Sequence, residues 1–328
     1  MPDEFSSVAK PNVAGREGHG GSGVAGKSLL RRLRMWVQHG PYCVLLLRGA
    51  AFAMARRITR KQCPGYSIVK PLLADRRGLE VGGPTRMFSK GKVIPAYECC
   101  REIDNANFAR QTIWSGAADR RMFGGKLRSE YVVEATSFPM VADGTYDFVL
   151  ACHVLEHVAN PLRALHEWSR VLKPGGLVVV VVPDKRWTFD RRRPYTSFDH
   201  LEADFRSNIE EDDLTHLDEV LRLHDFALEA PGGSWEDFRD RCFQNVTVRA
   251  MHHHVFSPEV LIRMFAHARM QALSVAESQP NHIVAFAQKI TGSVGEEVLS
   301  QNLGLLGKRS DLTSHNFWRR KRPEHPPL

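Results

Sequence analysis

The sequence predicts an α/β fold built on a doubly wound, mostly parallel sheet. Three observations predict it. Short apolar segments alternate with helical patterns from Leu72 to about Lys289, which is the order of successive βα units. The first apolar segment ends in a Gly-Gly-Pro turn. The run Leu177–Val182 is apolar throughout, as in a strand buried on both faces. Any ligand is then expected at the carboxyl ends of the strands.

The first strand is expected at Gly78–Val81, directly before the turn Gly82-Gly83-Pro84. Glycine has no Cβ, so the backbone of this turn can approach a nucleotide-like ligand closely. The second strand is expected near Ala96–Ile103. Asp104 follows it, about 20 residues after Gly82, where dinucleotide-binding folds place the acid that binds ribose.

The remaining elements follow from apolar runs and helix-start signals. Helix Pro161–Leu172 carries apolar residues at core spacing and has proline at its first position, and another helix begins after the cap residue Ser257. Four further strands are expected, at Tyr131–Val133, Phe148–Ala151, Leu273–Ala276 and Ile283–Ala287.

Both ends of the chain are expected to lie outside the folded domain. Residues 1–28 predict a disordered arm; its Gly21–Ser28 string matches a P-loop, but no strand signal precedes it. Residues 29–71 predict a basic, amphipathic helical extension that either caps the domain or lies on an anionic membrane through residues 29–61. Residues 291–328 predict a disordered tail.

Charge and cysteine content limit the function. The net charge of +8 comes from residues 1–70, so the rest of the chain is near neutral and is not expected to grip a nucleic acid. None of the six cysteines forms a Cys-x-x-Cys pair, so neither a zinc site of cysteines nor a disulfide framework is indicated. The chain is expected in the cytoplasm, and the alternative is peripheral contact with the inner face of the membrane through its basic extension.

Four segments in order resemble the class I methyltransferases that use S-adenosylmethionine (SAM), in the group that acts on small molecules. They are Glu80-Val-Gly82-Gly83, Tyr146-Asp-Phe-Val-Leu150, His153-Val-Leu-Glu-His157 and Arg170-Val-Leu-Lys-Pro-Gly-Gly176. The resemblance implies a Rossmann-like, seven-stranded domain over residues 72–290, with an insertion at 184–250 after strand five. The family's third loop glycine would fall at Arg86, where this chain departs from the pattern.

The resemblance implies SAM as the cofactor. Contacts to it are then expected at eight positions: Glu80, Gly82, Gly83, Asp104, Glu134, Ala135, Cys152 and His153. Asp104 would bind the ribose hydroxyls. Glu134, in a segment similar to the family's adenine loop, would accept from the adenine amine, and its alternative is a solvated turn acid.

The segment after strand four bears on the acceptor. It matches neither the Asn/Asp-Pro-Pro motif of amine methyltransferases nor the Pro-Cys of cytosine C5 enzymes, which favours an oxygen nucleophile. Related quinone O-methyltransferases hold a divalent ion with Glu-x-x-Glu-His; His153 replaces the first carboxylate here, so no metal is predicted. His153 and His157 are candidate bases, with a structural histidine as the alternative for His157.

The insertion, with the His252-His253-His254 segment after it, is rich in titratable residues and is interpreted as a lid over the acceptor. It resembles the same region in a bacterial subgroup of SAM methyltransferases. His200 and His253 are further candidate bases, and six residues are candidate substrate contacts: Arg192, Arg193, His200, Asp204, His252 and His254. The arginines would bind an anionic acceptor. A His/Asp metal site and a solvated polar network are the alternatives.

Together these features predict a methyltransferase that acts on an oxygen of a small, sugar-like or anionic metabolite. Two alternatives remain. One is a SAM-binding regulatory module without turnover, because the loop lacks its third glycine. The other is an RNA methyltransferase that uses the basic arm, which the near-neutral domain disfavours.

Overall fold

The computed structural model describes residues 40–55 apart from 41 and 53, and residues 62–113, 120–229 and 234–291. The predicted arm at 1–28, its P-loop string and residues 292–328 lie outside the described residues. No helix among the described residues is long and apolar enough to cross a membrane.

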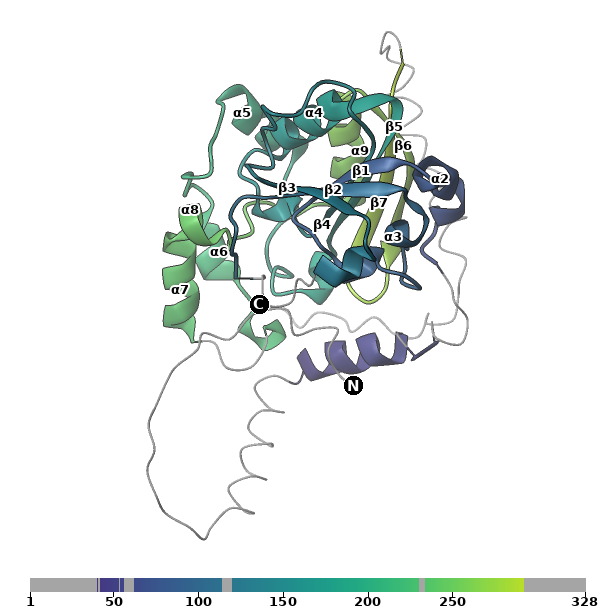
Figure 1. Ribbon diagram of the computed structural model, residues 1–328. Helices are drawn as coiled ribbons and strands as arrows, with labels where there is room; N and C mark the ends of the chain where they lie inside the picture. The colour runs from purple at the N-terminus through teal and green to yellow at the C-terminus, as the bar shows by residue number, and fades with distance from the viewer. Residues whose placement is uncertain are drawn as a thin grey trace, which may run out of the picture.

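A seven-stranded sheet forms the centre of the domain, in the order β3-β2-β1-β4-β5-β7-β6 (Figure 1). Its strands are β1 (Arg77–Val81), β2 (Glu102–Asn107), β3 (Leu127–Val132), β4 (Tyr146–Cys152), β5 (Leu172–Pro183), β6 (Met270–Ser278) and β7 (His282–Lys289). Strands β1 to β5 pair in parallel, and β7 is antiparallel to both β5 and β6. The predicted doubly wound, seven-stranded fold is confirmed.

Helices cover both faces of this sheet. On one face α4 (Pro161–Val171) and α9 (Pro258–His267) pack fully buried Trp168 and Phe265 against the strands. On the other face α2 (Tyr66–Leu73) and α3 (Ala96–Cys99) do the same with Tyr66 and Tyr97. The two apolar clusters bury both faces of the sheet, so a ligand is expected at the carboxyl ends of its strands.

Side-chain caps set the starts of α4 and α9, and the second of these caps, Ser257, was predicted from the sequence. Asn160 Oδ1 accepts from the backbone N–H of Arg163, and Ser257 Oγ accepts from Val260. Each satisfies a backbone donor that the first helical turn cannot. Helix α4 therefore begins at the predicted Pro161.

The expected second strand is wrong in position. Ala96–Cys99 is the short helix α3, and the strand is Glu102–Asn107, so Asp104 lies inside the strand and not after it. The strand's polar residues, Asn105 and Asn107, give it no apolar signal, while the apolar residues just before it predict a strand that does not form.

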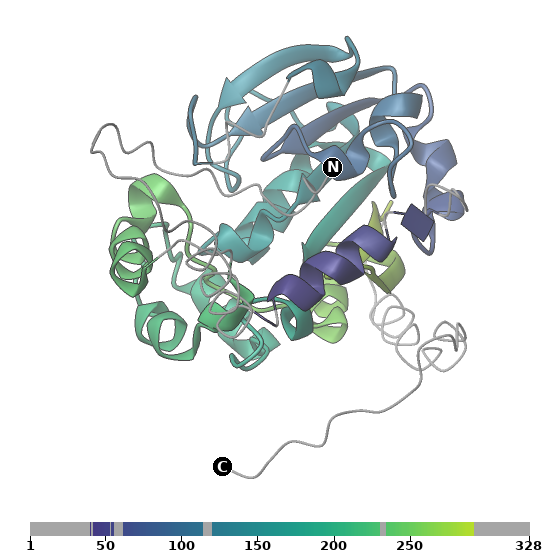
Figure 2. The same ribbon diagram turned by 90° about the horizontal axis from the view of Figure 1, so that it is seen from below.

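The insertion forms short helices. They are α5 (Phe198–Arg206), α6 (Leu217–Leu223), α7 (Trp235–Phe243) and α8 (Asn245–Val248), with the 3-10 turns η4 (Lys185–Trp187) and η5 (Phe226–Leu228). Three further 3-10 turns lie in the domain: η1 (Arg86–Phe88), η2 (Arg120–Phe123) and η3 (Leu155–His157). Figure 2 shows α6–α8 gathered beside the sheet.

A helix over residues 42–52 lies beneath the sheet, along the side where α6 and α7 also lie (Figures 1 and 2). Leu45 is buried, and Arg48 donates from Nε to the Oε1 atom of Gln279 at 2.6 Å. The Arg48 guanidinium also stacks 3.5 Å above the centre of the Trp187 ring. This part of the extension therefore packs on the domain.

Candidate active site

A cavity of about 1710 Å³ opens at the carboxyl ends of the parallel strands. Its walls are the Gly82–Thr85 loop, the ends of β2 and β4, the insertion and the helix over 42–52. Pockets for single ligands hold roughly 300–1,000 Å³. The cavity thus has room for a nucleoside cofactor and an acceptor side by side.

The glycine loop after β1 leaves no space for larger residues. Gly82 has φ +78°, and a Cβ there would lie 2.6 Å from Cγ2 of Val154; a Cβ on Gly83 would lie 2.2 Å from Cδ of Glu80. Both glycines line the cavity. The bare backbone that the sequence predicts for a ligand is present here.

Glu80 lies beneath this loop and does not line the cavity. The hydroxyl of Tyr97 donates to its Oε2 atom and accepts from the backbone N–H of Thr85 at 2.8 Å. Burial raises the pKa of Glu80 to about 8, against the opposing effect of the Tyr97 and Thr85 hydrogen bonds. A neutral carboxyl therefore supports the loop from below.

The structure places Asp104 away from the cavity. Its side chain is fully buried, and its Oδ2 atom accepts from Arg77 and from the hydroxyl of Tyr146, each at 2.8 Å. The residue that ends β2 in the cavity wall is Asn107, whose Nδ2 donates to the Gly83 carbonyl at 2.9 Å. Sequence reasoning missed Asn107 because the expected strand ended too early.

Glu134 and Ala135 follow β3 and line the cavity, as the adenine-loop resemblance implies. The Glu134 carboxylate pairs with Arg249 at 2.8 Å, and Arg249 also pairs with Glu211 at 2.7 Å. The Ala135 carbonyl accepts from the indole of Trp168 at 2.8 Å. Arg249 lines the cavity without having been singled out in the sequence, because no local pattern marks it.

Cys152 ends β4 and His153 follows it, and both residues line the cavity. His153 adopts a left-handed backbone conformation, φ 55°, which is uncommon for a residue other than glycine. Its Nε2 lies 2.9 Å from Nδ1 of His282. Burial, together with the neighbouring His282 and His252, lowers the pKa of His153 well below its usual value.

His252 faces the same cavity and is paired with a carboxylate. Its Nδ1 atom lies 2.5 Å from Oδ2 of Asp190, and its ring meets that of His157 edge to face at 4.6 Å. Burial alone would lower the pKa of His252, but the Asp190 carboxylate raises it above the usual value. Burial opposes ionisation of Asp190, yet contacts with His252 and Arg193 lower its pKa to about 2. The pair is thus an ionised carboxylate beside a basic imidazole.

His157 lines the cavity beside this pair. Burial and the adjacent His252 lower the pKa of His157 well below its usual value, and its Nδ1 lies 3.2 Å from the Met251 carbonyl. Glu156 lies behind both rings, fully buried, and burial raises its pKa to about 7. Because His157 stays neutral, its ring does not repel the positive charge of His252 when that histidine is protonated.

The other residues singled out in the insertion and in the segment after it do not line the cavity. Arg193 is buried, where it bonds to Asp190, Glu219 and two backbone carbonyls, and the exposed Arg192 lies 3.3 Å from Asp225. The remaining four are His200, Asp204, His253 and His254. His253 is fully buried against Asn245 at 3.0 Å. The structure therefore gives these residues no contact with an acceptor in the cavity.

An aromatic subsite next to His252 went unpredicted. The Phe189 ring lies 4.9 Å from that of His252 and stacks on His224, which packs on Phe238 at 4.0 Å. Arg241 lines the same part of the cavity, and its buried Nε makes no hydrogen bond within the described residues. Phe189 follows η4, His224 lies between α6 and η5, and Phe238 and Arg241 lie on α7, so only the folded insertion brings them together.

Comparisons with known proteins agree with this architecture. A family model described as a methyltransferase domain matches residues 54–268. No curated protein matches.

Three solved structures of methyltransferases are similar to the chain, two of them described as SAM-dependent. One, from Methanosarcina mazei, is 19% identical, with 71% of this chain and 100% of that chain covered and a TM-score of 0.42. Another, from Mesorhizobium loti, is 11% identical, with 69% of this chain and 96% of that chain covered and a TM-score of 0.41. A third is the 1,6-didemethyltoxoflavin N1-methyltransferase of Burkholderia thailandensis. It is 12% identical, with 84% of this chain and 94% of that chain covered and a TM-score of 0.39.

The family model spans most of the described domain, and the strand order places a bare glycine loop, Asn107 and Ala135 around one cavity. These residues fit a nucleoside cofactor at the carboxyl ends of the strands. The chain belongs to the methyltransferase-domain family, and its strand order and bare glycine loop are those of a class I methyltransferase that depends on SAM.

Proposed function

We propose that this methyltransferase transfers its methyl group to an oxygen of a small, sugar-like or anionic acceptor, with His252 as the general base. The observation that carries this is the His252–Asp190 pair in the cavity wall, 2.5 Å between Nδ1 and Oδ2. An oxygen nucleophile carries a proton that a base removes, and a carboxylate-oriented histidine is suited to that task.

The cofactor would lie on the sheet side of the cavity. Gly82 and Gly83 would let the backbone approach the methionine end, Asn107 would bind a ribose hydroxyl, and Ala135 would lie against the adenine. Bound SAM supplies an electrophilic methyl group on a sulfonium. Asn107 here takes the role expected of Asp104, since it ends β2 in the cavity.

The acceptor would lie between the cofactor and the insertion. Phe189 and Phe238 line this part of the cavity and would pack against a sugar or another flat group, and the positive charge of Arg241 there would favour an anionic acceptor. With Nδ1–H donated to Asp190, the Nε2 lone pair of His252 receives the hydroxyl proton as the oxygen attacks. Neutral His153 and His157 line the floor without competing for that proton.

The test is methyl transfer from radiolabelled SAM into the low-molecular-mass fraction of a cell extract. We expect His252→Gln to lower the rate on the order of 10²- to 10⁴-fold while calorimetry shows unchanged affinity for S-adenosylhomocysteine. The control is His166→Gln, on α4 away from the cavity. An unchanged rate in His252→Gln would refute the base assignment.

The same experiment separates the alternatives. Label in a small molecule that resists amine-specific derivatisation supports an O-methyl product. Binding of S-adenosylhomocysteine without any transfer would indicate a regulatory module, and label in the RNA fraction would indicate an RNA methyltransferase.

A further inference from the structure

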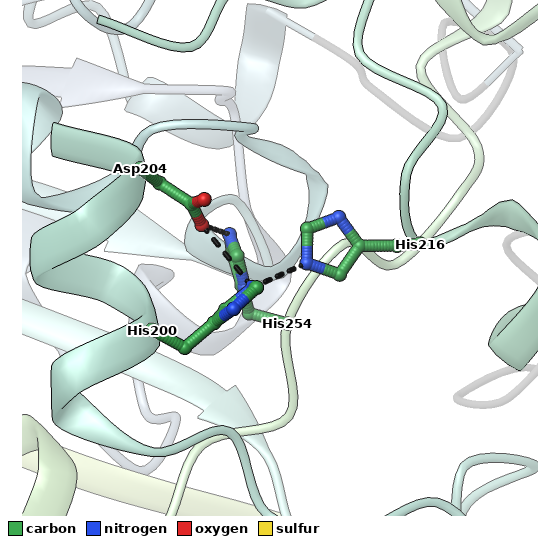
Figure 3. A group of neighbouring side chains, drawn as sticks. All are labelled: His200, Asp204, His216 and His254. Atoms are coloured by element: carbon green, nitrogen blue, oxygen red, sulfur yellow. Dashed lines mark hydrogen bonds and ion pairs between the residues drawn. The ribbon is translucent and has the colours of Figure 1, made fainter. Parts of the chain in front are cut away.

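We propose that His200, Asp204, His216 and His254 form a zinc site that fastens the insertion to the methyltransferase domain. Figure 3 shows the four side chains converging from separate segments. His200 and Asp204 are one turn apart on α5, His216 precedes α6, and His254 lies in the segment before α9. None of the four lines the cavity, so the site is distinct from the active site.

The spacing suits one small ion. The four ligand atoms all lie within 4.8 Å of one another. Nε2 of His200 is 2.8 Å from Nε2 of His216 and 3.3 Å from Oδ2 of Asp204. Two ligands of a tetrahedral zinc ion, each about 2.0–2.1 Å from the metal, lie about 3.3 Å apart. Small side-chain shifts would therefore bring all four atoms into the coordination shell.

The surroundings orient these ligands. Nδ1 of His216 lies 3.3 Å from the carboxylate of Asp213, so its Nε2 faces the cluster as a lone pair. That is the carboxylate–histidine arrangement that accompanies metal-bound histidines. Nε2 of His254 lies 3.1 Å from the Ala159 carbonyl, which fixes that ring to the loop before α4.

Two buried atoms of the cluster have no hydrogen bond within the described part of the chain. They are Oδ2 of Asp204 and Nδ1 of His254, and the His254 side chain is fully buried. An acceptor left without a donor in a buried site costs roughly 1–3 kcal/mol. A cation bound at the cluster would relieve that cost.

Ligand chemistry and number indicate zinc in a structural role. Three imidazoles and one carboxylate suit zinc, and four protein ligands leave no open position for a reaction. The ion would join α5, the start of α6 and the His252–His254 segment, which also carries the cavity residue His252. Because His200 is partly exposed, an ion could enter from solvent.

A second histidine pair provides the control. Nε2 of His166 lies 2.9 Å from Nδ1 of His267, as close as the His200–His216 pair. No third ligand completes it among the described residues. If close histidines alone retained zinc, both pairs would do so.

The experiment measures zinc in the full chain after chelator treatment, re-equilibration with Zn²⁺ and desalting. We expect one zinc per chain in the wild type and in His166→Gln, and at least a tenfold loss of affinity in His200→Ala and His216→Asn. Asp213→Asn should lower the affinity about 10- to 100-fold through the orientation of His216. Substitution of Co²⁺ should give the visible absorption of a tetrahedral ion.

Calorimetry with S-adenosylhomocysteine shows whether each variant is folded. Zinc uptake by the wild type no greater than by His200→Ala, or an equal loss in His166→Gln, would overturn the proposal and leave a hydrogen-bonded histidine network. Because the readout is metal content, the result is independent of the assignment of His252 as the base.

Discussion

Two buried carboxyl groups near the cavity, those of Glu80 and Asp190, differ in protonation state because their hydrogen-bonding partners differ. Glu80 is surrounded by hydroxyl and amide donors, and burial raises its pKa to about 8. Asp190 is equally buried, yet His252 and Arg193 lower its pKa to about 2. At neutral pH the first is a neutral support for the glycine loop and the second is the anion that orients a base.

Glu80→Gln should remove one component of the pH dependence of stability. The pKa of Glu80 rises from 4.5 in the unfolded chain to about 8 in the fold. Its contribution to stability is therefore fully present below pH 4.5 and is lost as the pH rises through 8. We expect the wild type to lose about 4 kcal/mol more than the variant across that range, measured by urea unfolding. Parallel pH profiles would show that Glu80 is ionised.

Asp190→Asn should alter the pH–rate profile. Without the carboxylate the pKa of His252 falls, so the rising limb of kcat should shift to lower pH while the plateau drops on the order of 10²-fold. Glu219→Gln is the matched control, since Glu219 also bonds Arg193, at 2.9 Å, without contacting His252 in any described pair. An identical profile in both variants would assign Asp190 a purely structural role.

The predicted site residues that line the cavity are mostly those whose place is fixed by local chemistry. Gly82, Gly83, Cys152 and His153 follow apolar strands, and all line the cavity. Asp104 shows the limit, because a shift in strand boundary changes which side chains reach the ligand edge. Asn107 and Arg241 acquire their positions from the fold and carry no sequence signal of their own.

At the scale of the elements, the turn between β1 and η1 sets the cofactor side of the site. Gly82→Ala should abolish S-adenosylhomocysteine binding, because a Cβ would lie 2.6 Å from Cγ2 of Val154. Gly124→Ala tests strain alone: Gly124 has φ +62° with open space around it. Both variants should lose roughly 1 kcal/mol of stability, and only the first should lose binding by calorimetry. Equal binding in the two would show that the loop adapts.

Most of the sheet and the covering helices α4 and α9 were predictable, while α3 and the helices of the insertion were not. Helices α4 and α9 carry caps and apolar residues at helical spacing, and β5 is uniformly apolar. Helices α6 and α8 are only 7 and 4 residues long, too short to show a period in the sequence. Helix α6 packs with α7 in a small apolar cluster that includes Val220 and Phe238 and is separate from the two clusters flanking the sheet.

At the scale of the whole molecule, the helix over residues 42–52 closes one side of the cavity. Leu45→Asp should undock it, because burial of a leucine contributes about 1.5–3 kcal/mol, and should weaken S-adenosylhomocysteine binding about tenfold by calorimetry. Leu47→Asp is the control, since Leu47 is 62% exposed. Tight binding in both variants would show that the helix does not matter for the cofactor.

The glycine loop belongs to the sheet, whereas His252, Phe189 and Arg241 belong to the insertion or border it. In the proposed function, methyl donation and acceptor choice would therefore depend on different stretches of polypeptide. Evolution could redesign residues 184–250 for a new acceptor while the donor half stays unchanged. Transplanting this stretch between relatives should accordingly carry acceptor preference along with it.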